Sequence, residues 1–417
     1  MGKTIIEKII SNHTKQKVSR GEIVWMDIDV RTARDFGGAN VVKHIENDFL
    51  NNHYLYNPAK IFFTFDCNAP ATTTDYATNQ QRCRHFATKY GIKVYDVNRG
   101  IGSHVLIEEG LALPGNTVAG TDSHLNIVGA VGSFGQGMGD RDIAFIFKYG
   151  KTWLEVPPTM KIIIFGNIEY PLTAKDLTLA ILKELGSSGA LGSVIEFYGE
   201  VISRLDLAGR ITLASMATEM GAVASIIPPD EKIINYCKKR AKEEFNLVTA
   251  DFDAEYIETK EIKLENLTPL ISAPPSPANV YPVEELEGIK VDSVFIGSCT
   301  NGRIEDYRDL ANLIRKRKVH PRVMAKIVPA TQKVYEEMLK EGLLAQLFEA
   351  GFIISNPGCG GCASGQIGIT GEGEVQVSTS NRNFPGKQGK GETYLASPVV
   401  AAAAAVAGEI ISPFKLL

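Results

Sequence analysis

The sequence predicts an α/β fold built from layers of parallel strands and helices. Two observations support this fold class. Short runs of β-branched and aromatic residues alternate with helical patterns along the chain, as in proteins whose parallel strands are joined by helices. The chain also has 417 residues, which is too long for one ordinary core and predicts two or three packed domains. Its 44% hydrophobic and 22% charged residues are typical of a globular protein.

The individual elements follow from short apolar runs and from longer amphipathic ones. Strands are predicted, in chain order, over residues 60–66, 92–97, 116–123, 160–166, 291–298, 322–328 and 351–355. Helices are predicted over residues 79–91, 174–186 and 331–342, and several of them end at a glycine, the usual C-cap residue. The apolar segment 399–408 is too short to span a membrane, so we expect a closely packed buried helix there.

Proline content marks the expected domain boundaries. Five prolines lie in residues 268–288, which predicts an extended inter-domain connection, and a weaker boundary is expected near 155–160. We therefore predict three subdomains, at residues 1–157, 158–275 and 276–417.

Charge and cysteine content exclude several classes of protein. A net charge of −4 gives no basic field to recruit nucleic acid. The first sixteen residues contain no apolar core long enough for a signal peptide, and six cysteines do not build a secreted disulfide framework. We expect a cytoplasmic protein that binds neither nucleic acid nor a membrane.

Two cysteine-containing turns are the first candidates for chemistry. Cys359 and Cys362 lie in NPGCGGCASG, where glycines free the backbone to wrap around a ligand. Cys299 follows a predicted strand in GSCTNGR and precedes a helix expected to start near Ile304, a position that faces the ligand crevice of an open α/β sheet. The alternative for Cys299 is a small, buried hydrophobic residue.

The number of thiols bears on what these turns bind. A structural zinc site needs four ligands, and no histidine is adjacent to either turn, while a redox pair would not need Cys299. Three thiolates suit an iron–sulfur cluster with one iron left open to substrate. Spacing alone leaves a disulfide, a redox pair, zinc and a cluster as alternatives.

A third motif brings an acid and a base together. Asp122, Ser123 and His124 end a predicted strand, so a carboxylate there can set the protonation of His124. A structural histidine is the alternative. Glycines 129–139 are similar to those of a nucleotide-binding loop, but the G-x-x-x-x-G-K-[ST] pattern is absent from the sequence.

In chain order, GTDSH, VIEFYG, GSCTNGR, NPGCGGC and SNRNFPG resemble the aconitase superfamily of iron–sulfur hydro-lyases. The resemblance covers nearly the whole chain, and it is closest to free-standing large subunits of the 3-isopropylmalate dehydratase and homoaconitase type. It implies three α/β/α layered subdomains around a central cleft, without the mobile C-terminal domain of longer single-chain members.

The resemblance also implies roles for individual residues. Cys299, Cys359 and Cys362 would hold one 4Fe–4S cluster, with Asn301 and Asn381 forming hydrogen bonds around it. The implied catalytic residues are Asp66, His104, Asp122, His124 and Glu196, and the implied substrate-binding residues are Ser123, Arg382 and Lys387. A surface cation is the alternative for Arg382.

Two positions depart from the family pattern. Cys67 stands where a histidine usually follows the aspartate, and a thiol differs from imidazole in geometry and pKa. We interpret Cys67 as a buried inert thiol, with an extra cluster ligand as the alternative. Lys387 stands where an arginine is common, which keeps the charge but loses the bidentate grip on a carboxylate.

The implied activity is the reversible removal of water from a hydroxy di- or tricarboxylate such as 3-isopropylmalate, with the open iron as Lewis acid. The family's catalytic serine lies on the mobile domain, so we expect a small subunit to supply it in trans. The alternatives are a homoaconitase, a hydratase of dimethylmaleate or another substituted malate, and an RNA-binding apo-protein, which the acidic charge disfavours.

Overall fold

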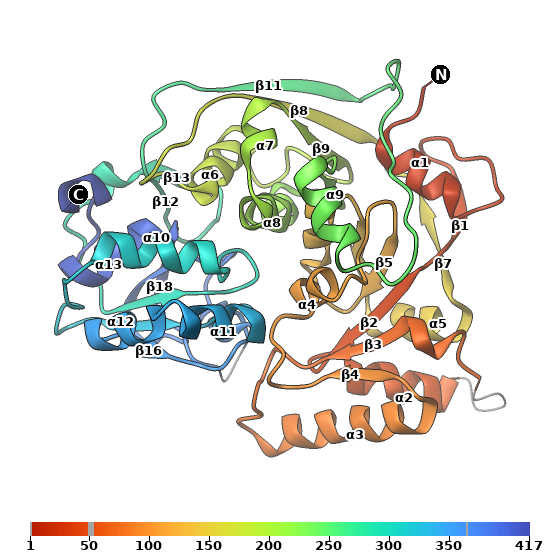
Figure 1. Cartoon of the computed structure of the whole chain (residues 1–417), viewed down its shortest axis with the longest axis horizontal. Helices are drawn as coiled ribbons and strands as arrows, with labels where there is room; N and C mark the ends of the chain where they lie inside the picture. Colours follow the sequence, from red (N-terminus) through yellow and green to blue (C-terminus); the bar gives the residue numbers. More distant parts are fainter. Residues whose placement is uncertain (1, 49–53, 364–365) are drawn as a thin grey trace.

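Three sheets and a two-stranded ribbon form the framework of the molecule. The computed structural model describes residues 2–48, 54–363 and 366–417. The sheets have five, four and seven strands, in the orders β4-β3-β2-β5-β6, β10-β9-β8-β11 and β13-β12-β18-β17-β14-β15-β16 (Figure 1). The ribbon pairs β1 (Ile23–Asp27) with β7 (Lys151–Glu155) in antiparallel fashion.

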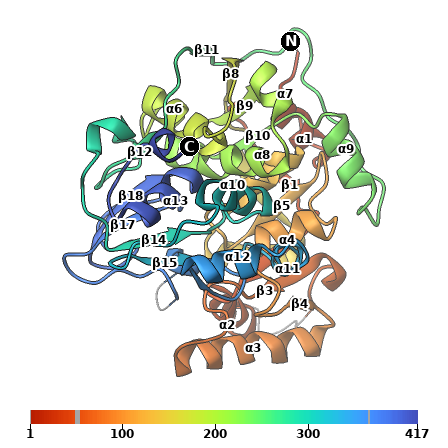
Figure 2. The same ribbon diagram turned by 60° about the vertical axis from the view of Figure 1, so that its left-hand side comes forward.

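The first sheet is entirely parallel. Its strands are β2 (Val30–Arg34), β3 (Ile61–Thr64), β4 (Lys93–Tyr95), β5 (Thr117–Gly120) and β6 (Phe134–Gly137). Its helices are α2 (Gly38–Asp48), α3 (Thr74–Tyr90), α4 (Gly102–Glu108) and α5 (Asp140–Tyr149), and α3 lies at the outer end of the molecule in both views (Figures 1 and 2). Because the strands run in parallel, Arg34, Asp66 and Asp122 follow carboxyl ends that meet at one edge of this sheet.

The second sheet is also parallel. Its strands are β8 (Thr159–Gly166), β9 (Val194–Tyr198), β10 (Ala224–Ile226) and β11 (Glu258–Leu264). The helices of this part are α6 (Ala174–Leu185), α7 (Glu200–Arg204), α8 (Leu207–Met216) and α9 (Glu231–Lys238), and the N-terminal helix α1 (Ile5–Asn12) packs nearby.

The third sheet is mixed. Its parallel strands are β14 (Ser293–Ile296), β15 (Met324–Ile327), β16 (Ile353–Ile354), β17 (Val375–Ser378) and β18 (Glu392–Ala396), and an antiparallel edge is formed by β12 (Leu270–Ser272) and β13 (Val280–Pro282). The helices are α10 (Ile304–Ile314), α11 (Gln332–Lys340), α12 (Leu343–Ala350) and α13 (Pro398–Ala407).

The alanine-rich segment forms the buried helix α13, as predicted. Ser397 caps its start by accepting a hydrogen bond from the backbone N–H of Val400, and Gly408 ends it with a φ of 76°. Alanine side chains allow close packing, and residues 398–405 are all buried. Within the described ranges, no helix is both long and apolar enough to cross a membrane.

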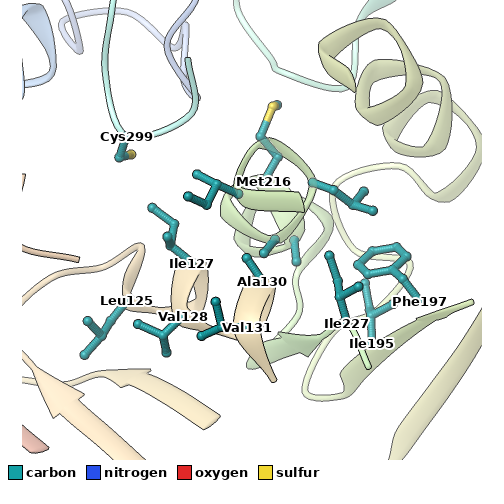
Figure 3. Packing of buried hydrophobic residues seen from close by; sticks show 14 of the residues in the cluster. Leu125, Ile127, Val128, Ala130, Val131, Ile195, Phe197, Met216, Ile227 and Cys299 are labelled. Atoms are coloured by element: carbon teal, nitrogen blue, oxygen red, sulfur yellow. The ribbon is translucent and has the colours of Figure 1, made fainter. Parts of the chain in front are cut away.

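The glycine-rich segment is explained by packing. It forms the 3-10 helix η2 (Leu125–Val131), which packs against α8 in a core cluster that includes Cys299 (Figure 3). A Cβ atom at Gly129 would stand 1.8 Å from the carbonyl oxygen of Ser225. Only glycine allows the two backbones to approach so closely, so the glycines here join the first two sheets.

The α/β fold class is confirmed, and each predicted strand and helix forms within a few residues of its expected bounds. Residues 268–288, expected to be an extended connection between domains, also contain β12 and β13, whose backbone groups pair at the edge of the third sheet. The three larger sheets draw their strands from residues 30–137, 159–264 and 270–396, and the division into three subdomains stays a prediction.

Candidate active site

The candidate site is a cavity of about 500 Å³ between the carboxyl edges of the first and third sheets. Several chain segments meet there, among them the loops after β2, β3 and β5, the two cysteine turns, and the segment after β17. The cavity is lined by Cys299, Cys359 and Cys362, by Asp122, Ser123 and His124, and by Arg34, Cys67, Asn381, Arg382 and Lys387, among others.

Local backbone conformation presents the thiols to this cavity. Ser298 has a φ of 78°, rare for a residue with a side chain, at the turn directly before Cys299. Gly360 has a φ of 56°, and a Cβ atom there would stand 2.6 Å from the ring of Phe295, so this position between Cys359 and Cys362 needs glycine. The backbone N–H of Cys359 also donates to the carbonyl oxygen of Asp66, which joins the third sheet to the first.

Two of the three thiols, those of Cys299 and Cys362, lie in an environment that favours their neutral form unless a positive centre is bound. Burial, and then the neighbouring Cys362, raise the pKa of Cys299 well above its ordinary value. Burial likewise raises the pKa of Cys362 to about 11. Such thiols ionise only when a metal takes the place of the proton.

The spacing of their ligand atoms bears on what the three cavity cysteines could hold. In the described ranges, one set of three metal-ligating side chains has its ligand atoms within 4.8 Å of one another, namely Asp66, Cys67 and Cys359. Cys299, Cys359 and Cys362 do not form so tight a set, although they line the same cavity. Their wider spacing argues against one ion held by these three thiols alone and leaves room for a larger group.

Arg34, which lies in none of the predicted motifs, connects two aspartates to one of the cysteine thiols. Its Nε donates to Oδ1 of Asp66 at 2.8 Å, its Nη1 to Oδ1 of Asp122 at 3.1 Å, and its Nη2 to Sγ of Cys359 at 2.5 Å. Burial raises the pKa of Asp122, but Arg34 and then His124 outweigh burial and lower this pKa overall. At Asp66 burial prevails over Arg34 and raises the pKa to about 6.

Glu219, also missed from the sequence, joins two of the predicted residues. Its Oε1 lies 3.0 Å from Nε2 of His124 and accepts a hydrogen bond from Nε of Arg382 at 2.7 Å. Burial raises the pKa of Glu219, but His124 and Arg382 outweigh burial and lower it overall. Glu219 follows the largely apolar helix α8, and no motif in the sequence there indicated a functional residue.

The role expected for Glu196 is corrected by the structure. Its carboxylate accepts hydrogen bonds from the backbone N–H of Ile5 at 2.7 Å and from the hydroxyls of Tyr198 and Tyr256 at 2.7 and 2.9 Å. Glu196 does not line the cavity, because the start of α1 covers the end of β9. Its carboxylate therefore holds the N-terminal helix, whereas Glu219 contacts His124 and Arg382, two residues that line the cavity.

Two further expected residues lie beside the cavity rather than in its wall. His104 is buried, and its Nε2 donates to the carbonyl oxygen of Cys299 at 2.9 Å. Burial and the nearby Arg303 lower the pKa of His104 to about 3, so the ring is neutral at pH 7. The amide nitrogen of Asn301 donates to Thr212 and Asp306, and Asn301 lines a different cavity, so its expected place around the cluster is corrected.

The remaining expected residues are brought together. Oδ1 of Asn381 lies 3.3 Å from Sγ of Cys299, and Nζ of Lys387 donates to the carbonyl oxygen of Cys362 at 3.0 Å. Ser123 is exposed at the rim, with its hydroxyl 3.4 Å from Nδ1 of His124. Sγ of Cys67 lies 3.4 Å from Oδ1 of Asp66, and a hydrogen bond with Cys359, followed by burial, raises the pKa of this thiol well above its ordinary value.

The chain is similar to known proteins along nearly its whole length. A model of the aconitase family (aconitate hydratase) matches residues 7–288 and 284–408. The chain is 42% identical over 416 residues to the 3-isopropylmalate dehydratase large subunit 1 of Methanopyrus kandleri, covering 99% of both chains. It is 41% identical to the 3-isopropylmalate dehydratase large subunit of Aquifex aeolicus, covering 100% of this chain and 98% of that protein.

A solved structure is similar in fold. The holo-form of Thermococcus kodakaraensis aconitase X superimposes with a TM-score of 0.53 at 14% identity, covering 85% of this chain and 84% of that one. This likeness supports the α/β architecture alone. The family match along nearly the whole sequence and the full-length relatives at about 40% identity lead to one conclusion: the chain belongs to the aconitase family.

Proposed function

We propose that this chain is the large subunit of an aconitase-type hydro-lyase that dehydrates and rehydrates a substituted malate such as 3-isopropylmalate. The observation that supports this most directly is the meeting of three thiols, an acid–base pair and three cationic side chains in one cavity. The names of full-length relatives at about 40% identity point to the same substrate.

In this proposal Cys299, Cys359 and Cys362 hold one 4Fe–4S cluster, and Asn381 forms a hydrogen bond beside it. When bound, the cluster supplies an open iron that acts as a Lewis acid toward the substrate. Cys67 lies close to Cys359 but belongs to the tighter group with Asp66, and we assign it no place among the three ligands.

The chain's own side chains bind and orient the substrate. Among the described residues, Arg382 is held by Glu219 through Nε alone, which leaves its two terminal nitrogens to form the fork that matches a carboxylate. Lys387 adds a second positive charge at the same cavity. Two cations within one cavity suit a dicarboxylate.

The acid–base residues hold protons near the substrate. Glu219 fixes the ring of His124 through Nε2 and leaves Nδ1 beside the Ser123 hydroxyl at the rim. Arg34 keeps Asp122 ionised, so Asp122 accepts rather than donates a proton at neutral pH. His104, neutral and buried, positions the backbone of Cys299.

The partner in this proposal is a small subunit with a mobile domain and the catalytic serine. The names of the relatives, which are large subunits, support a second chain. We place the complex in the reducing cytoplasm, since all six cysteines are free and three of them would serve as cluster ligands.

The test is an anaerobic assay of the chain purified together with its small subunit. We expect a brown protein that turns over 3-isopropylmalate faster than homocitrate or dimethylmaleate, and a chain alone that is nearly inactive. A cluster-loaded complex that converts none of the three acids would refute the proposal. Faster conversion of homocitrate or dimethylmaleate would refute the substrate assignment while retaining the reaction.

A further inference from the structure

A second cavity lies behind the loop that presents Cys299. Its volume is about 210 Å³, and it is bounded by the first turns of α8 and α10 and by the start of α6. Asn301 lines this second cavity, whereas Cys299, two residues earlier, lines the candidate active site. The loop from Cys299 to Asn301 therefore separates the two cavities.

Acidic side chains dominate the wall of the second cavity. Asp206, Glu305, Asp306 and Asp309 line it, and no salt bridge involves any of these four among the residues that the structure describes. The one cation in the wall is Arg204, which pairs with Glu200 and Asn167. The wall thus carries an excess of negative charge, and the cations that interact with Glu305, Arg303 and Arg308, stand outside it.

Buried oxygens without partners point to a missing ligand. Asn301 is 1% exposed, and its Oδ1 has no hydrogen-bond partner although its amide nitrogen has two. Oε2 of Glu305 is also buried and without a partner. Buried polar atoms in native proteins are satisfied by protein, water or an ion.

The raised pKa values of two carboxyl groups are consistent with a site that lacks its ligand. Burial, followed by the neighbouring carboxylates, raises the pKa of Asp309 to about 6. Burial raises the pKa of Asp306 to about 7 despite hydrogen bonds from Asn301 and the backbone of Arg303. These acids are crowded together at a site that lacks a cation to stabilise their ionised form.

We propose that this cavity binds a hydrated divalent cation of the Mg²⁺ class. Its lining offers oxygen ligands, which hard cations prefer, and no cysteine or histidine. The carboxylate oxygens here do not form a tight set within 4.8 Å, so the cation is held partly through its own waters, as Mg²⁺ usually is. The volume suffices, because one water occupies ~30 Å³ of liquid.

The position of the cation gives it a structural effect on the thiol loop. The hydroxyl of Thr212, in the same wall, donates to the carbonyl oxygen of Thr300 at 2.9 Å and lies 3.3 Å from the amide of Asn301. A cation that attracts the Asn301 side chain holds the loop at the point where Thr212 contacts it. Binding therefore stabilises the folded chain and the loop that presents Cys299.

The test uses Mn²⁺ as a paramagnetic probe of the cluster-loaded full chain after removal of divalent metals. Free Mn²⁺ is counted by its EPR signal during a titration, and excess Mg²⁺ is added at the end. The variants are Asp309→Asn alone and Asp309→Asn combined with Glu305→Gln, both nearly isosteric. The matched control is Glu284→Gln with Glu285→Gln, which removes two exposed carboxylates elsewhere.

We expect one saturable Mn²⁺ per chain, displaced by Mg²⁺, in the wild type and in the control. The single variant should bind at least threefold more weakly and the double variant at least tenfold, with unchanged visible absorbance of the cluster. Mg²⁺ should raise the unfolding temperature of the wild type and leave that of the double variant unchanged. Absence of saturable Mn²⁺ binding, or equal affinity in the wild type and the double variant, would overturn the proposal.

Discussion

We propose that Glu219, rather than Glu196, is the active-site glutamate, and replacing Glu219 by glutamine tests this reassignment. In the structure Glu219 is 3% exposed at its side chain and contacts both His124 and Arg382 through one oxygen. A hydrogen bond to a charged group contributes about 1.5–3 kcal/mol, and glutamine keeps an acceptor but loses the charge. We therefore expect a loss of about 2–4 kcal/mol in transition-state stabilisation.

Such a loss corresponds to a roughly 30- to 1000-fold lower kcat/KM, since each 1.36 kcal/mol is about tenfold in rate. The assay follows the absorbance of the unsaturated acid, with the small subunit in excess. Visible absorbance and iron content of Glu219→Gln should equal those of the wild type, because Glu219 is not among the proposed cluster ligands.

Glu196→Gln is the control for this experiment. The carboxylate of Glu196 accepts hydrogen bonds from Tyr198, Tyr256 and Ile5, and the NH2 group of a glutamine cannot accept them. We therefore expect the free energy of unfolding to fall by about 1–3 kcal/mol. At a temperature where this variant is folded, its kcat/KM should match the wild type. If Glu196→Gln lowers kcat/KM as much as Glu219→Gln does, the reassignment is wrong.

Three further predictions concern the thiols, the substrate and pH. Serine at Cys299, Cys359 or Cys362 should abolish the brown absorbance and the bound iron, whereas Cys67→Ser should keep both; iron loss on Cys67→Ser would contradict the ligand set. Lys387→Arg should lower KM roughly tenfold, since a second charge-assisted hydrogen bond contributes about 1.5 kcal/mol, and initial-rate kinetics measure it. Because the pKa of Asp309 is raised from 3.8 to about 6 on folding, its contribution to stability is full below about pH 4 and is lost as pH rises to about 6. Denaturant unfolding without divalent metals should show a smaller fall in stability over this range for Asp309→Asn, and identical slopes would contradict the assignment.

Most of the fold was predictable because its signals are local. Strand β8 and helix α6 each have an uninterrupted pattern and a clear end, and both form at nearly the expected residues. The proline-rich edge strands were not predictable, because β12 and β13 are three residues long and depend on pairing with β18 and with each other. Short strands acquire their identity from their partners rather than from their own sequence.

The candidate site was predictable where a motif places the residue and its neighbours together. The thiols and the Asp122–His124 pair lie in such motifs. Arg34 and Glu219 do not, since the groups they contact lie up to 325 residues away and nothing beside them in the sequence reports those contacts. Glu196 shows the opposite case. It lies in a motif that resembles the family, so a role in the active site was expected, but its carboxylate contacts the N-terminal helix.

The contact of Glu219 with His124 and Arg382 also bears on biosynthesis. The three residues are separated by 95 and 163 positions along the chain, and each follows an element of a different sheet. During translation the first two sheets emerge long before Arg382 does, and domains generally fold in the order of synthesis. A growing chain therefore lacks this contact until Arg382 has emerged, so the substrate site that we propose is complete only late in synthesis.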